Sequence, residues 1–326
     1  MSSAHASKSV IFAALAGNLG IALTKTLAAV FTGSAAMFSE AVHSFADTGN
    51  QMLLLLGMRQ AAKPADEDHP FGYGLRLYFW TFVVAMLIFG VGATVALYEG
   101  VDKILHPHPA EHVWVNYLVL GASVLFEGLV WIKALQAFRH EKGDRGWMDA
   151  IRRSKDPTVF TVLFEDSAAL AGLVVALIGV ALSQTLQMPW IDGAASVVIG
   201  LMLAATAFLL AYESMSLLTG EGVPRPVRQS IRKLVQDQPE VLRLNELLTM
   251  HFSPQDVLVT VSVDFRDDLA SGQLEQVVSR LDARIKAMHP EVRRVFIEAQ
   301  SFEGHQRQLA ADDARLNPEA ENAHPA

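Results

Sequence analysis

Long apolar stretches separated by short polar segments dominate the first two thirds of this chain. Six of them reach the roughly 20 residues that an α-helix needs to cross the hydrocarbon core of a bilayer. Apolar residues make up 51% of the chain and charged residues only 18%. The apolar share is above that of soluble globular domains and the charged share is below it. We therefore expect a six-helix transmembrane bundle in residues 1–218, with spans near 9–33, 36–59, 77–101, 114–138, 158–184 and 190–218.

The last third of the chain has a different composition, because residues 219–326 hold most of the carboxylates. Four valines and Phe265 occupy every second position over 257–265 and alternate with Leu258, Thr260, Ser262 and Asp264, which is the period of a half-buried strand. Apolar residues recur at helical spacing over 224–238 and 274–288, and 295–297 is short and strand-like. We expect a small α/β domain with the order αββαβ at 219–305, followed by a disordered tail at 306–326.

Basic residues in the expected connections predict the orientation of the spans. Six Lys and Arg residues lie between the fourth and fifth spans and three flank the connection between the second and third, whereas the outer connections hold only Lys103. Because cytoplasmic loops are enriched in Lys and Arg, both termini are expected in the cytoplasm. The short polar segment Met1–Ser9 resembles neither a cleaved signal nor a transit peptide, which favours a bacterial inner membrane over an organelle.

Ionisable side chains inside the second apolar stretch indicate its function. His43 and Asp47 are four residues apart and project from one face of a helix, and Glu40 lies near the same face. Such groups are costly within a membrane and usually mark an ion path. Imidazole and carboxylate together suit zinc, and the alternative is a His–Asp hydrogen bond that ties helices together. The chain has no cysteine, so any metal site must use nitrogen and oxygen ligands.

Several motifs resemble those of the cation diffusion facilitators. They are the pair His43 and Asp47, the segment 66–74 (Asp-Glu-Asp-His-Pro-Phe-Gly-Tyr-Gly) and an acidic residue early in the fifth span. The segments 39–44, 123–128 and 163–169 are similar to the zinc-transporter-nine-like branch of that family. The resemblance covers residues 9–302. It implies a homodimer that exports a divalent metal ion in exchange for protons, with a metallochaperone-like cytoplasmic domain.

The resemblance also implies a third metal ligand, Asp166 in the fifth span. The family has a His or Asp four residues earlier, but this chain has Val162, so the four-ligand site is one ligand short. The fourth ligand could be a water or one of three carboxylates. Glu165 is turned about 100° from Asp166 around the helix and would need a rotated or distorted helix. The other two candidates are Glu127 and Glu40.

Each of these carboxylates could have a role other than binding the metal ion. Glu127 and Glu165 could instead pair with Lys25 inside the bundle. Glu40 lies close enough to the expected start of its helix to be solvated.

Two further regions match metal sites of the family only in part. Asp66 and His69 correspond to two ligands of an interfacial site, but the third position is Tyr73, and a neutral phenol is a poor zinc ligand. The alternative is a polar loop whose segment His69-Pro-Phe-Gly packs against the dimer or the cytosolic domain. In the cytoplasmic domain, the positions that match ligands are Asn245, Ser262, Glu298 and Gln300. We therefore expect that domain to dimerise with little or no metal binding.

These observations predict a proton-coupled, alternating-access efflux transporter for a divalent cation. Zinc is the expected substrate, with Mn²⁺, Co²⁺, Ni²⁺ and Fe²⁺ as alternatives, and no prosthetic group is expected. The other interpretation is a non-transporting membrane metal sensor or scaffold. An enzyme is not expected, because the chain lacks a His-Glu-x-x-His signature. The net charge of −8 and the lack of a basic face exclude a nucleic-acid partner, leaving a second copy of the chain, the metal ion, protons and the bilayer.

Overall fold

The computed structural model describes residues 12, 15–27, 30, 35–107, 113–142 and 157–316, without the side chains of residues 35–43, 113, 116, 140, 141, 157–159 and 316. Part of the expected disordered tail, residues 317–326, lies outside these ranges. The chain forms two compact units, Met1–Thr219 and Gly220–Ala326, and each is described by itself.

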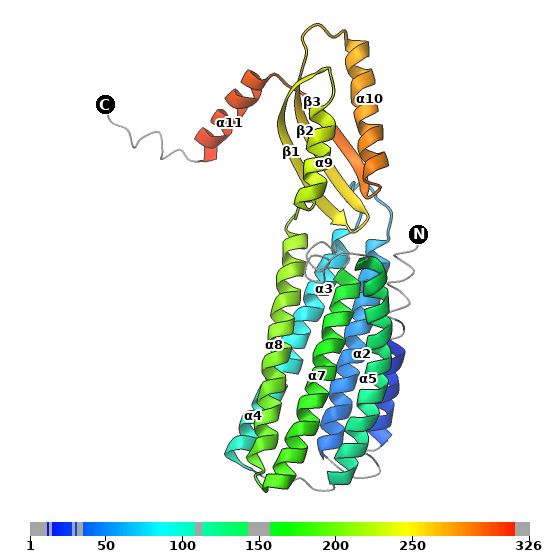
Figure 1. The fold of residues 1–326 in the computed structure, drawn as a ribbon, viewed down its shortest axis with the longest axis vertical. Coiled ribbons are helices and arrows are strands. Elements are labelled where there is room, and N and C mark those ends of the chain that lie inside the picture. The colour runs from blue at the N-terminus through cyan, green and yellow to red at the C-terminus, as the bar shows by residue number, and fades with distance from the viewer. Residues whose placement is uncertain are drawn as a thin grey trace, which may run out of the picture. The chain divides into compact units, whose positions relative to one another are not determined.

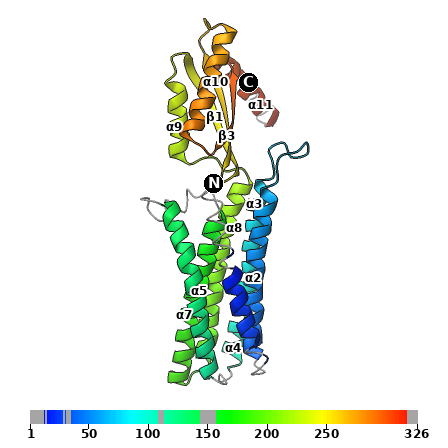
Figure 2. The same cartoon turned by 90° about the vertical axis from the view of Figure 1, so that its right-hand side faces the viewer.

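Long helices that run alongside one another make up the first unit (Figures 1 and 2). Residues 15–27 are helical. The helices that follow are α2 (Ala35–Ala61), α3 (Leu75–Leu87), α4 (Thr94–Leu105), α5 (Val113–Lys142), α7 (Pro157–Leu186) and α8 (Trp190–Leu218). A π-helical segment, η1 (Ile88–Ala93), joins α3 to α4 without a break.

Four helices in the described part of the chain are long and apolar enough to cross a membrane. They are Leu75–Leu105, Tyr117–Arg139, Phe160–Leu186 and Trp190–Leu218, and they coincide with the last four expected spans. The other two expected spans correspond to α2 and to the helical residues 15–27. The centre of α2 carries polar side chains, among them Asp47, Asn50 and Gln51, which suits a helix that faces other helices rather than lipid.

Small residues allow α4 and α8 to touch through their backbones. A Cβ atom built on Gly193 would lie 2.7 Å from the carbonyl oxygen of Gly100, and one built on Gly100 would lie 2.8 Å from that of Gly193. Both distances are too short for any side chain. Glycine at facing positions is the usual means of close helix approach in membranes, so these two residues fix the spacing of α4 and α8.

The second unit is a three-stranded sheet with helices. Its elements are α9 (Arg225–Gln236), β1 (Val241–Ser253), β2 (Asp256–Phe265), α10 (Ser271–Met288), β3 (Val292–Ala299) and α11 (Phe302–Leu316). Strand β2 lies in the centre, antiparallel to β1 and parallel to β3. Its valines at alternate positions are buried against Ile231 of α9 and Leu281 of α10. The predicted αββαβ order is confirmed.

The prediction of a disordered tail from residue 306 is wrong for its first part, which belongs to α11. Contacts with the strands hold the start of this helix. The backbone N–H of Phe302 donates a hydrogen bond to the carboxylate of Asp264 at 3.1 Å. The guanidinium of Arg243 lies 3.9 Å from the centroid of the Phe302 ring. These partners lie far away in the sequence, so the composition of the tail could not reveal them.

Candidate functional site

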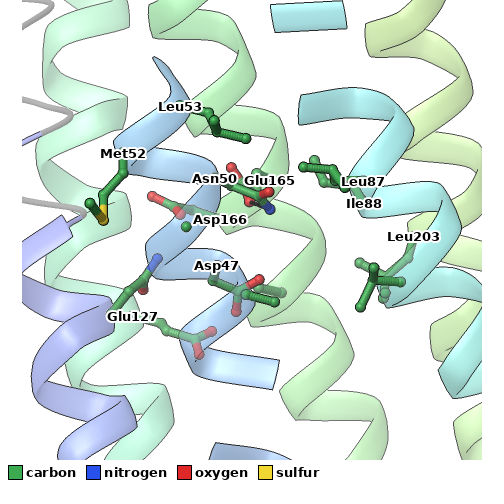
Figure 3. Close-up of a pocket in the computed structure, with 16 residues that line it drawn as sticks. Asp47, Asn50, Met52, Leu53, Leu87, Ile88, Glu127, Glu165, Asp166 and Leu203 are labelled. Carbon is green, nitrogen blue, oxygen red and sulfur yellow. Dashed lines mark hydrogen bonds between the residues drawn. The ribbon is translucent and has the colours of Figure 1, made fainter. Parts of the chain in front are cut away.

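A cavity of about 500 Å³ lies among the helices of the first unit (Figure 3). Its wall is mostly apolar and is built from α2, α3, η1, α5, α7 and α8, together with Asn18 of the first helical segment. The π-helical segment η1 contributes Val91 and Gly92, and π-helical turns occur frequently at functional sites. Four carboxylates line this otherwise apolar space: Asp47, Glu127, Glu165 and Asp166.

Among these carboxylates, Asp166 is in the environment that most favours a bound cation. It is 7% exposed, and its Oδ2 atom is buried without a hydrogen-bond partner among the described residues. A buried carboxylate oxygen without a partner is unfavourable. A cation in the cavity would supply the missing interaction, so the site suits a positively charged substrate.

Glu165 is held by two amides of α2. Its Oε1 accepts a hydrogen bond from Asn50 Nδ2 at 3.0 Å and its Oε2 accepts one from Gln51 Nε2 at 3.2 Å. It lines the cavity beside Asp166 although α7 is an undistorted α-helix over Pro157–Leu186. Glu165 therefore reaches the cavity wall from a regular helix, and its role as a metal ligand stays a prediction. Both oxygens of Glu165 thus have amide partners on α2, and its alternative pairing with Lys25 stays a prediction.

Val162, at the family position that lacks a ligand, does not reach the cavity wall. It is fully buried in an apolar cluster with Leu54, Phe138 and Phe160. Its role in this chain is packing. The missing ligand must therefore come from another position, if the ion has four protein ligands.

The structure brings together some of the predicted ligands. Asp47 and Glu127 line the cavity with Asp166. His43 and Glu40 lie on α2, but their side chains are outside the described part of the structure. Within the described residues, no three His, Cys, Asp or Glu side chains are grouped closely enough to hold one metal ion. The carboxylates thus share a cavity without forming a closed coordination shell.

Sequence reasoning missed Asn50 as a residue of this site. It lines the cavity, and it is only 5% exposed. The available signal was its spacing: it follows Asp47 by three residues in an apolar stretch, which places both side chains on neighbouring positions of one helix face.

The loop between α2 and α3 forms its own hydrogen-bonded turn. Tyr73 donates its hydroxyl to Asp66 Oδ2 at 2.6 Å, and the backbone N–H of His69 donates to Asp66 Oδ1 at 2.8 Å. The rings of His69 and Tyr73 lie 4.1 Å apart. The hydrogen bond from Tyr73 lowers the pKa of Asp66 and raises the pKa of Tyr73. Asp66 and His69 are therefore neighbours, and the phenol of Tyr73 lies beside them.

Three of the four positions of the second unit that match family ligands lie in contact with one another. They are Asn245, Ser262 and Gln300, which carry two amides and a hydroxyl. Asn245 Nδ2 donates to the carbonyl oxygen of Gln300 at 2.8 Å, and Ser262 Oγ donates to Gln300 Oε1 at 3.4 Å. Hydrogen bonds join the three residues, but Asn245 Oδ1 is buried without a hydrogen-bond partner among the described residues. They offer no charged ligand at this point.

Comparisons with known proteins identify the family of the chain. The model of the cation efflux transmembrane domain matches residues 11–219. The chain is 31% identical to the proton-coupled zinc antiporter SLC30A9, mitochondrial, of Xenopus laevis, over 84% of this chain and 56% of that protein. It is 31% identical to the human protein of the same name, over 74% of this chain and 43% of that protein. The chain therefore spans about half the length of these two relatives.

A bacterial relative is matched over nearly its whole length. The cation-efflux pump FieF of Shewanella oneidensis is 25% identical over 84% of this chain and 88% of that protein. The predicted resemblance to the zinc-transporter-nine-like branch is confirmed by the relatives named SLC30A9. With the family model covering well over half of its length, this integral membrane chain belongs to the cation efflux family, whose members are transporters and not enzymes.

Proposed function

We propose that this chain exports a divalent cation, with zinc as the substrate, in exchange for protons. The observation that carries the proposal is the buried, unpartnered Oδ2 of Asp166 in a cavity that Asp47 also lines. Two relatives are named as proton-coupled zinc antiporters, which supports the choice of both ions.

In this proposal Asp47, Asp166 and His43 are ligands of the transported ion. Asp47 comes from α2 and Asp166 from α7, so a bound ion joins two helices. Because the described carboxylates do not form a closed shell, binding requires side chains to move toward the ion. The cavity is large enough for that rearrangement. Glu127 remains on the wall as a further acidic group that attracts a cation into the cavity.

The exchange of metal for protons follows from the chemistry of the ligands. A carboxylate or imidazole binds a metal ion only after it has lost its proton. Protons on the acidic side of the membrane therefore displace the ion, and loss of those protons on the other side restores its affinity. Alternating access of the cavity to the two sides converts this competition into coupled transport.

We also propose a homodimer in a bacterial inner membrane with both termini in the cytoplasm. The distribution of Lys and Arg among the loops supports this orientation. The relative FieF from Shewanella oneidensis supports a bacterial membrane, whereas the relatives SLC30A9 are named mitochondrial. Cross-linking in intact cells and accessibility of engineered terminal cysteines test both points.

A non-transporting membrane metal sensor is the second candidate. The lack of a closed group of ligands among the described residues favours it. Zinc uptake into sealed proteoliposomes separates the two. Transport that accelerates when the lumen is made more acidic than the bath supports exchange, and metal binding without any uptake would support the sensor. Flux that follows voltage alone, with no response to a pH step, would contradict proton exchange.

A further inference from the structure

We propose that the side-chain amide oxygen of Asn50 supplies the metal ligand that Val162 does not. The inference rests on the proposed cation transport and adds one residue to the same site.

The placement of Asn50 is that of a ligand. It follows Asp47 by three residues on α2, so the two side chains are neighbours on one helix face. Both line the cavity that Asp166 also lines, and Asn50 lies beside Glu165 in the close-up (Figure 3). An ion held by Asp47 and Asp166 would thus occupy the cavity that the Asn50 side chain also lines.

The orientation of the amide follows from its hydrogen bond. Asn50 Nδ2 donates to Glu165 Oε1 at 3.0 Å. An ionised carboxylate can only accept hydrogen bonds, so it selects the nitrogen end of the amide and not the oxygen end. Within the described residues this is the one hydrogen bond of the Asn50 side chain. Its Oδ1 is thus left for an ion, and amide carbonyl oxygens are established ligands of divalent cations.

The need for such a ligand is visible in the same cavity. Asp166 Oδ2 is buried without a partner, and Val162 is packed away in the apolar cluster. A bound ion that contacts Asp166 Oδ2 and Asn50 Oδ1 would satisfy two oxygens at once. In this arrangement Glu165 is a positioning residue that fixes which end of the amide faces the ion.

The competing explanation is that Asn50 only braces Glu165. The neighbouring residue provides a matched control for this. Gln51 Nε2 donates to the other oxygen of the same carboxylate at 3.2 Å, but Gln51 is fully buried and does not line the cavity. Removing either amide costs Glu165 one hydrogen bond, but of the two residues only Asn50 lines the cavity.

The test uses Co²⁺ bound to the purified full-length protein in detergent, with Zn²⁺ as competitor. The visible absorption of Co²⁺ reports the identity and geometry of its ligands. We expect Asn50→Leu to weaken Co²⁺ binding by at least about tenfold, the lower bound seen even for outer-sphere residues, and to change the spectrum. Gln51→Leu should keep the parent spectrum, with less than about a threefold change in affinity. Equal effects of the two substitutions, or a parent-like spectrum in Asn50→Leu, would overturn the inference.

Asn50→Asp keeps an oxygen at the same position. It tests whether residue 50 contacts the ion even if Asn50→Leu does not fold. It should retain Co²⁺ and shift its absorption bands, because a carboxylate replaces an amide in the ligand set. An unchanged spectrum would overturn the inference. Asp166→Ala, which removes both side-chain oxygens, tests the site separately from the role of Asn50. If Asp166→Ala loses Co²⁺ while the Asn50 variants bind as the parent does, only the role of Asn50 is wrong. If Asp166→Ala also binds like the parent, the proposed site itself is wrong.

Discussion

The Tyr73 hydroxyl donates a hydrogen bond to Asp66 Oδ2 at 2.6 Å. Tyr73 stands at the position where the resemblance to the family implies a third ligand of the interfacial metal site. The loop is closed by a hydrogen bond and a ring contact with His69. The same residues that suggest a metal site in the sequence therefore form a self-contained turn.

Removing the Tyr73 hydroxyl should raise the pKa of Asp66 toward its ordinary value of about 3.9. The pKa is lowered in the folded loop, chiefly by this hydrogen bond. The contact thus stabilises the loop at pH values above the ordinary pKa, and the stabilisation is lost as pH falls through the lowered one. Carbon-13 NMR titration of labelled aspartate in the parent and in Tyr73→Phe measures the shift. Superimposable Asp66 titrations would contradict this account.

Replacing the phenol with an imidazole should create a metal site in the loop. His69 Nδ1 lies 3.5 Å from Asp66 Oδ1, and the Tyr73 ring lies beside His69. Tyr73→His would add the third ligand to this pair, so the variant should bind more Zn²⁺ per chain than the parent in equilibrium dialysis. Tyr73→Phe is the control and should bind no more than the parent. Equal zinc content in all three proteins would show that the loop geometry cannot hold the ion.

Adding a methyl group at the contact of α4 and α8 should destabilise the first unit. In Gly193→Ala, the new Cβ would lie 2.7 Å from the carbonyl oxygen of Gly100, so the helices must move apart. Overpacking of this kind costs about 1–3 kcal/mol. Gly121→Ala on α5 is the matched control, because no atom lies within 4 Å of its added Cβ. Thermal unfolding in one detergent compares the two, and equal melting temperatures would argue against backbone contact there.

The ion pair of Glu240 and Arg280 should give the second unit a pH-dependent stability. Arg280 Nη2 lies 2.6 Å from Glu240 Oε1, and its hydrogen bond is the main cause of the lowered pKa of Glu240. The stabilisation is present above the ordinary glutamate pKa of about 4.3 and disappears as pH falls through the lowered value.

Arg280→Gln should therefore unfold more easily than the parent at pH 7, and the two should converge in acid. Arg284→Gln removes a charge from the same helix. It should reduce the stability at pH 7 by less than Arg280→Gln does, and its loss of stability should depend differently on pH. A difference between Arg280→Gln and the parent that persists unchanged at low pH would exclude Glu240 as its source.

The fold could be predicted from the sequence wherever burial has a simple period. The alternating valines of β2 and the long apolar runs of α3 to α8 are examples. Contacts between distant residues were not predictable. Glu165 meets Asn50 and Gln51 across more than 100 positions of the chain, so spacing along α7 alone could not show that it shares the cavity with Asp166.

The most direct test of the central claim is zinc uptake into proteoliposomes whose lumen is more acidic than the bath. Asp166→Asn keeps the shape of the side chain and removes its charge, so the account predicts loss of proton-driven uptake with a folded protein. Asp192→Asn is the control, because Asp192 lies at the start of α8 beside Lys103 and outside the cavity. Uptake at the parent rate by Asp166→Asn would contradict the account.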